Sequence, residues 1–232
     1  MNLQRILEQH ELWVTTKGKD GQRALFSGVD LTGEDFTNAI LTSAIFTGAD
    51  LRGTNFTKAG LTSATLRHAD LRGTNLRGAD LRSADLRSAA LTNANFKGAD
   101  LTSAIFTGAI FKGANFTGAD LTGADLANAD LRGAEFRDAN FTSATLTGVT
   151  STDVDFTGAN LANADLRGAD LRGADLVSTT LTNANFTGAD LRGAELRDAE
   201  LTNATLTGAN FTGAWLSKKN QAYAWKRGAI IE

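Results

Sequence analysis

Large apolar residues recur at every fifth position over most of this 232-residue chain. From Phe26 to Leu216, every position whose number ends in 1 or 6 is Leu or Phe, except Ser151. These central residues mark 39 consecutive five-residue repeats without an insertion or deletion, and they include all 13 Phe of the protein. A period this strict predicts one repeat architecture rather than a series of different elements.

The other four positions of the repeat have their own preferences. Two residues before the central residue stands a small side chain, which is Ala in 32 of the 39 repeats. The residue directly before the centre is mostly Asp or Asn, and the residue after it is mostly Thr or Arg. Two after the centre, 36 of 39 residues are Gly, Ser, Asn or Asp, which favour turns.

This period fits neither a continuous helix nor a straight strand. Five residues advance an α-helix by about 140° beyond one turn, so the central residues would spread around its axis. In a strand an odd period would place successive centres on opposite faces. The pattern therefore predicts a bend in every repeat, at the turn-forming position. The large and the small residue point inward, and coils of short strands stack about 4.8 Å apart.

Tandem Ala-(Asp/Asn)-(Leu/Phe)-X-X units resemble the pentapeptide repeat family. The resemblance covers residues 24–218, about five-sixths of the chain. It implies an all-β solenoid, a right-handed quadrilateral β-helix with four repeats, hence 20 residues, per coil and about ten coils.

Both ends of the chain depart from the repeat, and we expect short helical caps there. Within residues 1–23, apolar residues and His10 recur at helical spacing, with Asn2 as a plausible N-cap. Residues 219–232 resemble a second short helix that includes Tyr223 and Trp225 and stops at Gly228. Open solenoid ends expose unpaired edges, so caps are expected. The C-terminal end is alternatively a homodimer contact, as in gyrase-targeting members of the family.

Twenty residues per coil sort the repeats into four columns. Six Phe fall in the column from Phe36 to Leu216, which predicts an aromatic ladder in the core. In the column from Leu31, a basic stripe after the centre runs beside an acidic stripe before it. We expect the two stripes to neutralise each other while adding little stability per pair.

Two stretches break the pattern and are candidate partner contacts. In VTSTDVD, Ser151 follows Thr150 and replaces a core Leu, while Val149 and Val154 replace Ala. The interpretation as local packing, with Ser151 bonded to a backbone carbonyl, competes with a bulge that a partner recognises. Ile105 and Ile110 stand where Asp or Asn is usual, so they form either an ordinary exposed pair or a contact site. With Tyr223 and Trp225, these residues complete the predicted site.

The composition mainly indicates which kinds of metal binding and catalysis to expect. There is no Cys, and the two His are far apart, so we expect no metal site, no cofactor and no enzyme. The net charge of −3 does not favour direct nucleic-acid binding. No stretch resembles a signal peptide or a membrane span, so we expect a soluble, cytoplasmic protein.

These observations favour a rigid scaffold that binds an unknown protein partner. The alternative is a DNA mimic that binds a type II topoisomerase such as DNA gyrase, as some members of the family do. The repeats carry 22 acidic and 16 basic residues, but they lack the loops that leave the coil in several such members. Ice binding is a third alternative, suggested by a column of Thr from Thr42 to Thr202.

Overall fold

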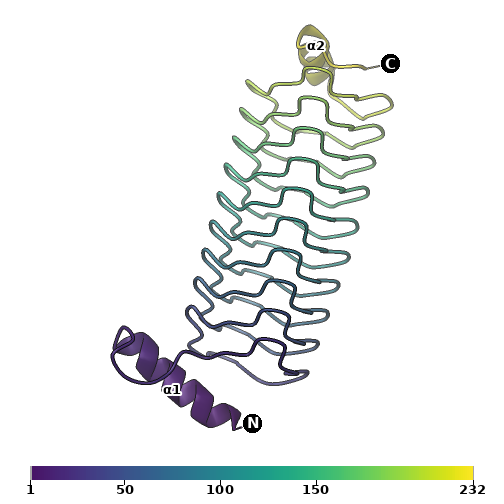
Figure 1. The fold of residues 1–232 in the computed structure, drawn as a ribbon. Coiled ribbons are helices and arrows are strands. Elements are labelled where there is room, and N and C mark those ends of the chain that lie inside the picture. The colour runs from purple at the N-terminus through teal and green to yellow at the C-terminus, as the bar shows by residue number, and fades with distance from the viewer. Residues whose placement is uncertain (1, 232) are drawn as a thin grey trace.

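The computed structural model describes residues 2–231 as a rod of stacked coils with a helix at each end (Figure 1). Helix α1 spans Leu3–Thr15 and helix α2 spans Lys218–Lys226. Between them, parallel bridges join each residue before a centre to the residue 20 positions later, from Leu25–Ile45 to Glu195–Trp215, and a last bridge joins Asn210 to Ile230. Each coil therefore holds four repeats, as the resemblance implied. Among the described residues no strand is longer than one bridge, because the chain turns after every fifth residue.

Each repeat turns at the predicted position. At a representative turn, the Ala84 N–H donates to the Leu81 carbonyl at 2.9 Å, and Ser83 has a φ of 55°. A left-handed backbone of this kind favours Gly and tolerates Asn, Asp and Ser. The Ser83 N–H then bonds the Thr102 carbonyl of the next coil at 2.9 Å. Most turns are thus held both within their own coil and against the next.

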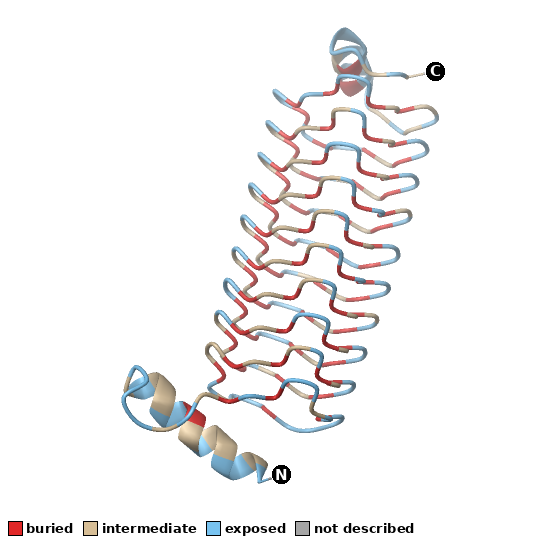
Figure 2. Ribbon diagram, viewed as in Figure 1, coloured by how far each residue is buried: buried red, intermediate tan, exposed pale blue. Residues whose placement is uncertain are grey.

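The core is a continuous column of central and small residues that are buried along the whole rod (Figure 2). Phe side chains stack between coils, as Phe96 and Phe116 do with ring centroids 4.4 Å apart. Rings from opposite sides also meet edge to face, as Phe36 and Phe46 do at 6.2 Å. The predicted aromatic ladder is confirmed, and its offset and edge-to-face geometries are those that aromatic pairs prefer.

The Asp or Asn before each centre stabilises the turn that follows that centre. Asp100 Oδ1 accepts hydrogen bonds from the Thr102 N–H at 3.0 Å and from its hydroxyl at 2.7 Å. Asn also links neighbouring coils, since Asn75 Nδ2 donates to the Thr57 hydroxyl at 2.9 Å. The preference for Asp and Asn therefore has a local structural cause.

Helix α1 closes the N-terminal end of the rod. The Asn2 side chain accepts from the Arg5 N–H at 3.1 Å, which confirms the expected N-cap. Leu3, Ile6 and Leu7 pack against the core, and His10 is buried. His10 Nδ1 accepts a hydrogen bond from the Ala24 N–H at 3.0 Å and so ties the cap to the first coil.

Helix α2 closes the other end. Ser217 is its N-cap, and Gly228, with a φ of 77°, follows its last turn as expected. Asn220 Nδ2 donates to the Ala199 carbonyl at 2.8 Å and anchors the helix on the last coil. The chain then returns to the rod, where Ile230 bridges Asn210, a return that the sequence pattern did not predict. Neither α1 nor α2 is long and apolar enough to cross a membrane.

We number the four faces by their central residues and call each level of a face a rung. Face 1 runs from Phe26 to Leu206, face 2 from Leu31 to Phe211, face 3 from Phe36 to Leu216 and face 4 from Leu41 to Leu201. Each face includes the residue before its centre and the two turn residues after it.

Candidate interaction face

Face 2 carries a ladder of Asp–Arg pairs. On the Asp50 rung, Arg52 Nη2 lies 2.6 Å from Asp50 Oδ2 and Arg52 Nε lies 2.8 Å from Asp50 Oδ1. The same arrangement recurs at Asp70–Arg72, Asp130–Arg132, Asp170–Arg172 and Asp190–Arg192. The predicted neutralisation of the two stripes is confirmed. Because the Arg side chains are about half exposed, each pair adds little stability.

The pairs keep these carboxylates ionised. Hydrogen bonds from Arg52 lower the pKa of Asp50 to about 2. The pKa values of Asp70, Asp130, Asp170 and Asp190 are lowered for the same main reason. A carboxylate held in this way is a poor proton donor or acceptor near neutral pH, so the intact rungs present fixed, self-neutralised charge.

The ladder is interrupted in the middle of the rod. Bridges place Ala90, Ile110 and Thr150 on rungs of face 2 where the other rungs hold Asp or Asn. Ile110 replaces the carboxylate that would face Lys112, and Lys112 has no ion pair among residues 2–231. Asp130 remains, with its pKa lowered chiefly by Arg132 and also by the charge of Lys112.

Ile110 is an exposed apolar side chain far from the ends of the rod, with 46% of its surface accessible. In the described part of the chain, the other exposed large apolar side chains lie near the ends: Leu12, Leu25, Ile40, Trp215, Trp225 and Ile230. End residues have a structural explanation in capping, whereas Ile110 has none.

Ser151 lies in the core of the same face and is fully buried. Its N–H and its hydroxyl both donate to the Asp170 carbonyl, each at 2.8 Å, which confirms the expected bond to a backbone carbonyl. Thr150 bridges both Asp130 and Asp170, so the register is kept and the ladder contains no bulge here. Val149 and Val154 on either side are also buried.

Two backbone hydrogen bonds that the other repeats form are absent beside Ser151. The turn bond from the Val154 N–H to the Ser151 carbonyl is not made, although every other turn from Phe26 to Ala214 has its counterpart. The bond from the Gly133 N–H to the Thr152 carbonyl of the next coil is also missing. Every other turn from Gly28 to Gly193 forms the equivalent bond to the next coil. The corner at Thr152 is therefore held by fewer hydrogen bonds than its neighbours.

A shallow groove of about 590 Å³ lies over this part of face 2. Its lining residues are Thr92, Asn93, Lys112, Gly113, Arg132, Gly133, Thr152 and Asp153. We call this groove together with Ala90, Ile110 and Thr150 the interrupted patch. It combines apolar surface, the cation of Lys112 and the carboxylate of Asp153, neither of which forms an ion pair within residues 2–231, and a weakly held corner.

The other predicted contact residues lie elsewhere. Ile105 is half-buried on face 1 between Asp85 and Asp125, so it does not share a face with Ile110. Tyr223 is half-buried on α2, and its hydroxyl donates to the Ala204 carbonyl at 3.5 Å. Trp225 is 73% exposed on the same helix. The predicted contact residues therefore do not form one site, because some lie in the middle of the rod and the others lie at its C-terminal end.

Trp215, which is absent from the predicted contact residues, is 67% exposed. It bridges Glu195 at the position before a centre, where the rungs from Asp35 to Glu195 carry Asp, Asn or Glu. An aromatic residue at a polar position was the signal that could have identified it.

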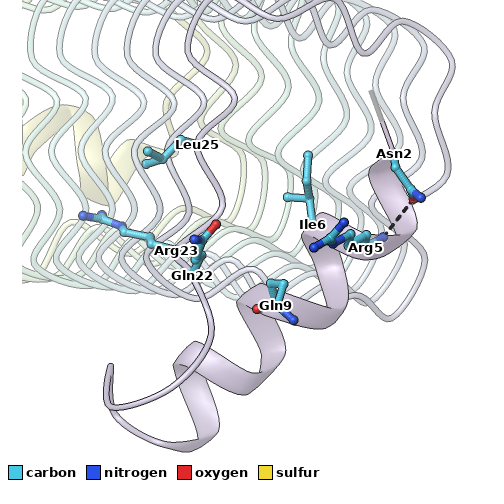
Figure 3. Close-up of a pocket in the computed structure, with 7 residues that line it drawn as sticks. All are labelled: Asn2, Arg5, Ile6, Gln9, Gln22, Arg23 and Leu25. Carbon is cyan, nitrogen blue, oxygen red and sulfur yellow. Dashed lines mark hydrogen bonds between the residues drawn. The ribbon is translucent and has the colours of Figure 1, made fainter.

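A second hollow, of about 470 Å³, lies between α1 and the first coil (Figure 3). Its lining residues are Asn2, Arg5, Ile6, Gln9, Gln22, Arg23 and Leu25. It contains two guanidinium groups and no carboxylate, so it offers no acid–base pair. Within residues 2–231 no cluster of three His, Asp or Glu side chains is placed to hold a metal ion.

The sequence matches the model of pentapeptide repeats in eight copies, over residues 22–57, 59–98, 79–118, 119–150, 152–188 and 184–218. The chain therefore belongs to the pentapeptide repeat family, whose members fold as right-handed quadrilateral β-helices. Ser151 falls between two of the matched segments.

Among solved structures, the chain is similar to HetL, a protein involved in heterocyst differentiation regulation from the cyanobacterium Nostoc sp. strain PCC 7120. The identity is 31%, the match covers 90% of this chain and 96% of HetL, and the TM-score is 0.49. A pentapeptide repeat protein of the Arabidopsis thaliana thylakoid lumen is 34% identical over 52% of this chain and 80% of its own, with a TM-score of 0.28. QnrB1, a plasmid-mediated fluoroquinolone resistance protein, is 22% identical over 88% and 95%, with a TM-score of 0.44. No curated protein sequence matches the chain.

Proposed function

We propose that this protein is a non-enzymatic, rigid scaffold in the cytoplasm that binds a protein partner through the interrupted patch of face 2. In this proposal residues 24–218 form a rod of about ten coils, and residues 1–23 and 219–232 cap its ends. The observation that carries the proposal is the loss of Asp at Ala90, Ile110 and Thr150, beside an unpaired Lys112.

Intact and interrupted rungs differ in what they offer a partner. On an intact rung, each carboxylate already accepts two hydrogen bonds from its Arg, so a partner would have to replace satisfied interactions. On the interrupted rungs, Ile110 provides apolar surface and Lys112 provides a charge that is not neutralised. Apolar area with a polar rim is the usual composition of a protein interface.

The backbone supports this role because it is preorganised. Coil-to-coil hydrogen bonds and a close-packed core fix the positions of the rungs. A rigid surface loses little conformational entropy when a partner binds. The patch can therefore bind with few contacts.

Site-specific photo-crosslinking in the source cells tests the proposal. A photoreactive amino acid placed at Ile110 should give a discrete adduct with a partner, identified by mass spectrometry. The same group at Asp50 or Asp190, on intact rungs of the same face, should give none. Equal adducts at all three positions, or none at any, would contradict the proposal.

A matched variant separates binding from folding. The substitutions Ala90→Asp and Thr150→Asp add negative charge on both sides of the Ile110 and Asp130 rungs while leaving the core unchanged. The adduct at position 110 should weaken while the melting temperature stays within a few degrees of that of the parent. A lost adduct accompanied by a large drop in melting temperature would point to unfolding instead.

Binding to a type II topoisomerase as a DNA mimic is the second candidate. Face 4 favours it, because Asp80, Asp100 and Asp120 occupy successive rungs. Only Arg82 faces them, at 2.6 Å from Asp80 and 3.6 Å from Asp100. A supercoiling assay with DNA gyrase, with and without a quinolone, tests it. Inhibition or protection that is lost in the triple Asp→Asn variant of these residues would support mimicry, and no effect at micromolar protein would exclude it.

We also propose the C-terminal end as a homodimer contact. Trp215, Trp225 and Ile230 are each more than half exposed there. Burial of such side chains stabilises an interface. At about 500 mM salt, which screens charge contacts, a dimer of the wild-type protein that dissociates in the W215A/W225A variant, measured by sedimentation, would support this contact, and an unchanged dimer would contradict it.

A further inference from the structure

Face 3 carries opposite charge in its two halves. From the Asn55 rung to the Asn115 rung, its charged residues are Lys58, Arg77 and Lys97, without a single acid. From the Glu135 rung to the Glu195 rung, two Arg accompany six acids: Glu135, Asp138, Asp155, Asp175, Glu195 and Asp198. The stretch of face 3 from Asn55 to Asn115 is therefore basic, and the stretch from Glu135 to Glu195 is acidic.

Neither half is neutralised within the molecule. Lys58, Arg77 and Lys97 take part in no ion pair among residues 2–231. In the acidic half, Arg137 pairs with Asp155 and Arg197 pairs with Glu195. Four carboxylates remain without a cationic partner in the described residues: Glu135, Asp138, Asp175 and Asp198. This differs from face 2, where most charges are paired on their own rung.

The basic half is hollowed into a groove of about 420 Å³. Its lining residues are Thr57, Lys58, Arg77, Gly78, Lys97, Gly98, Thr117, Gly118 and Asp138. Gly at three successive turns leaves the floor of the groove without side chains. A ridge of acidic side chains can therefore approach the three cations closely.

We propose that face 3 is a self-association surface on which two copies of this chain lie side by side and antiparallel. A two-fold axis near the Asn115 rung would set the basic half of each copy against the acidic half of the other. The Lys97 rung then faces the Glu135 rung, the Arg77 rung faces the Asp155 rung, and the Lys58 rung faces the Asp175 rung. All three pairings occur at once because both copies have the same rung spacing, about 4.8 Å.

Charge complementarity selects a second copy as the occupant. The acids that match the three cations lie on the same face, at equal numbers of rungs from Asn115. A parallel arrangement would instead place like charges together, which is unfavourable. The contact is mostly electrostatic and hydrated, so we expect a weak dimer that salt dissociates.

Charge-reversal variants test the proposal. Variant one, K58E/R77E/K97E, gives both stretches of the face an excess of acids, and variant two, E135K/D138K/D175K/D198K, gives both stretches an excess of cations. In a W215A/W225A background, which removes the proposed C-terminal contact, sedimentation velocity at about 20 mM salt should show dimers for the protein with its native face 3 and only monomers for each variant alone. A 1:1 mixture of the two variants should restore a dimer, and about 500 mM salt should dissociate it. Recovery in the mixture also shows that both variants are folded.

Small-angle scattering distinguishes this contact from dimerisation through the C-terminal end. A side-by-side dimer keeps the maximum dimension of about one rod, whereas an end-to-end dimer nearly doubles it. The W215A/W225A variant should retain the salt-sensitive dimer. A wild-type monomer at low salt, self-association of either variant alone, or a mixture that stays monomeric would overturn the proposal.

Discussion

Ile110 and Thr150 lie on the two rungs next to that of Asp130, although they are 40 residues apart in the chain. The Arg132 guanidinium therefore pairs with the carboxylate on its own rung and makes no second ion pair with the next rung within residues 2–231. Arg52, by contrast, also lies 3.8 Å from Asp70 on the following rung. The inter-rung ion pair seen at Arg52 therefore has no counterpart at Arg132 in the described residues.

The first prediction concerns the core at Ser151. Ser151→Ala should cost about 1 kcal/mol of unfolding free energy, because one hydrogen bond is lost while the Ser151 N–H still bonds the Asp170 carbonyl. Ser151→Leu should cost about 1–3 kcal/mol, since the valines on either side fill space that Ala leaves open in other repeats.

Adding Val149→Ala and Val154→Ala to Ser151→Leu should recover that loss, as measured by urea unfolding. Stabilisation by Ser151→Leu alone would show that the valines do not occupy the missing volume.

The second prediction concerns Gly173, where a Cβ would lie 2.5 Å from Asp153 Oδ1. Gly173→Ala should cost about 1–2 kcal/mol for its left-handed backbone, plus the cost of displacing Asp153. Gly53→Ala is the matched control, because Gly53 has nearly the same φ and open space around its Cβ position. Asp153→Gly should remove the excess cost of Gly173→Ala, and thermal unfolding of the double-mutant cycle measures this. Equal costs at Gly53 and Gly173 would show that Asp153 moves freely.

The third prediction concerns acid. The folded protein lowers the pKa of Asp50 from 3.8 to about 2, and those of the other ladder carboxylates in the same direction. Their contribution to stability is therefore complete above the pKa of an Asp in the unfolded chain, 3.8, and is lost as the pH falls from there through the pKa values of the folded protein. The melting temperature should fall more steeply between about pH 4 and pH 2 in the wild type than in a variant with the five ladder Asp changed to Asn. Parallel curves would contradict this.

The fourth prediction concerns the N-terminal cap. Burial lowers the pKa of His10 below 6.5, partly opposed by the Thr42 carbonyl and aided by the charge of Arg23. His10 Nδ1 accepts the Ala24 N–H, and protonation would replace this acceptor with a donor. Docking of α1 on the first coil should therefore be fully stabilised above pH 6.5 and should weaken as the pH falls below 6.5.

Fluorescence of Trp13, which stacks on His10 at 5.6 Å, reports this change in a W215F/W225F background. His10→Gln should abolish the pH dependence between about pH 7.5 and pH 5. A transition that persists in His10→Gln would assign it to another group.

The repeat predicted the coil and its core because one local rule applies 39 times. The same rule predicted that Asp and Arg on face 2 would pair, since the Asp directly precedes and the Arg directly follows the same central residue. The common face of Ile110 and Thr150 follows from a 20-residue coil, whereas the repeat pattern along the chain marks each only as a separate break. The missing bond at Gly133 and the return of Ile230 depend on backbone geometry around single irregular residues, which no periodic rule describes.

The coil of four repeats also constrains how the gene can change. Loss or duplication of one repeat preserves the core, since any centre can stack on any other. It would nevertheless rotate everything downstream by a quarter turn, so the residues of face 3 would continue the column of face 2 or face 4. Only gains or losses of whole coils keep each face in phase. The surface residues that act together on this rod therefore recur every four repeats. Recombination that leaves the fold intact can still move them to different faces.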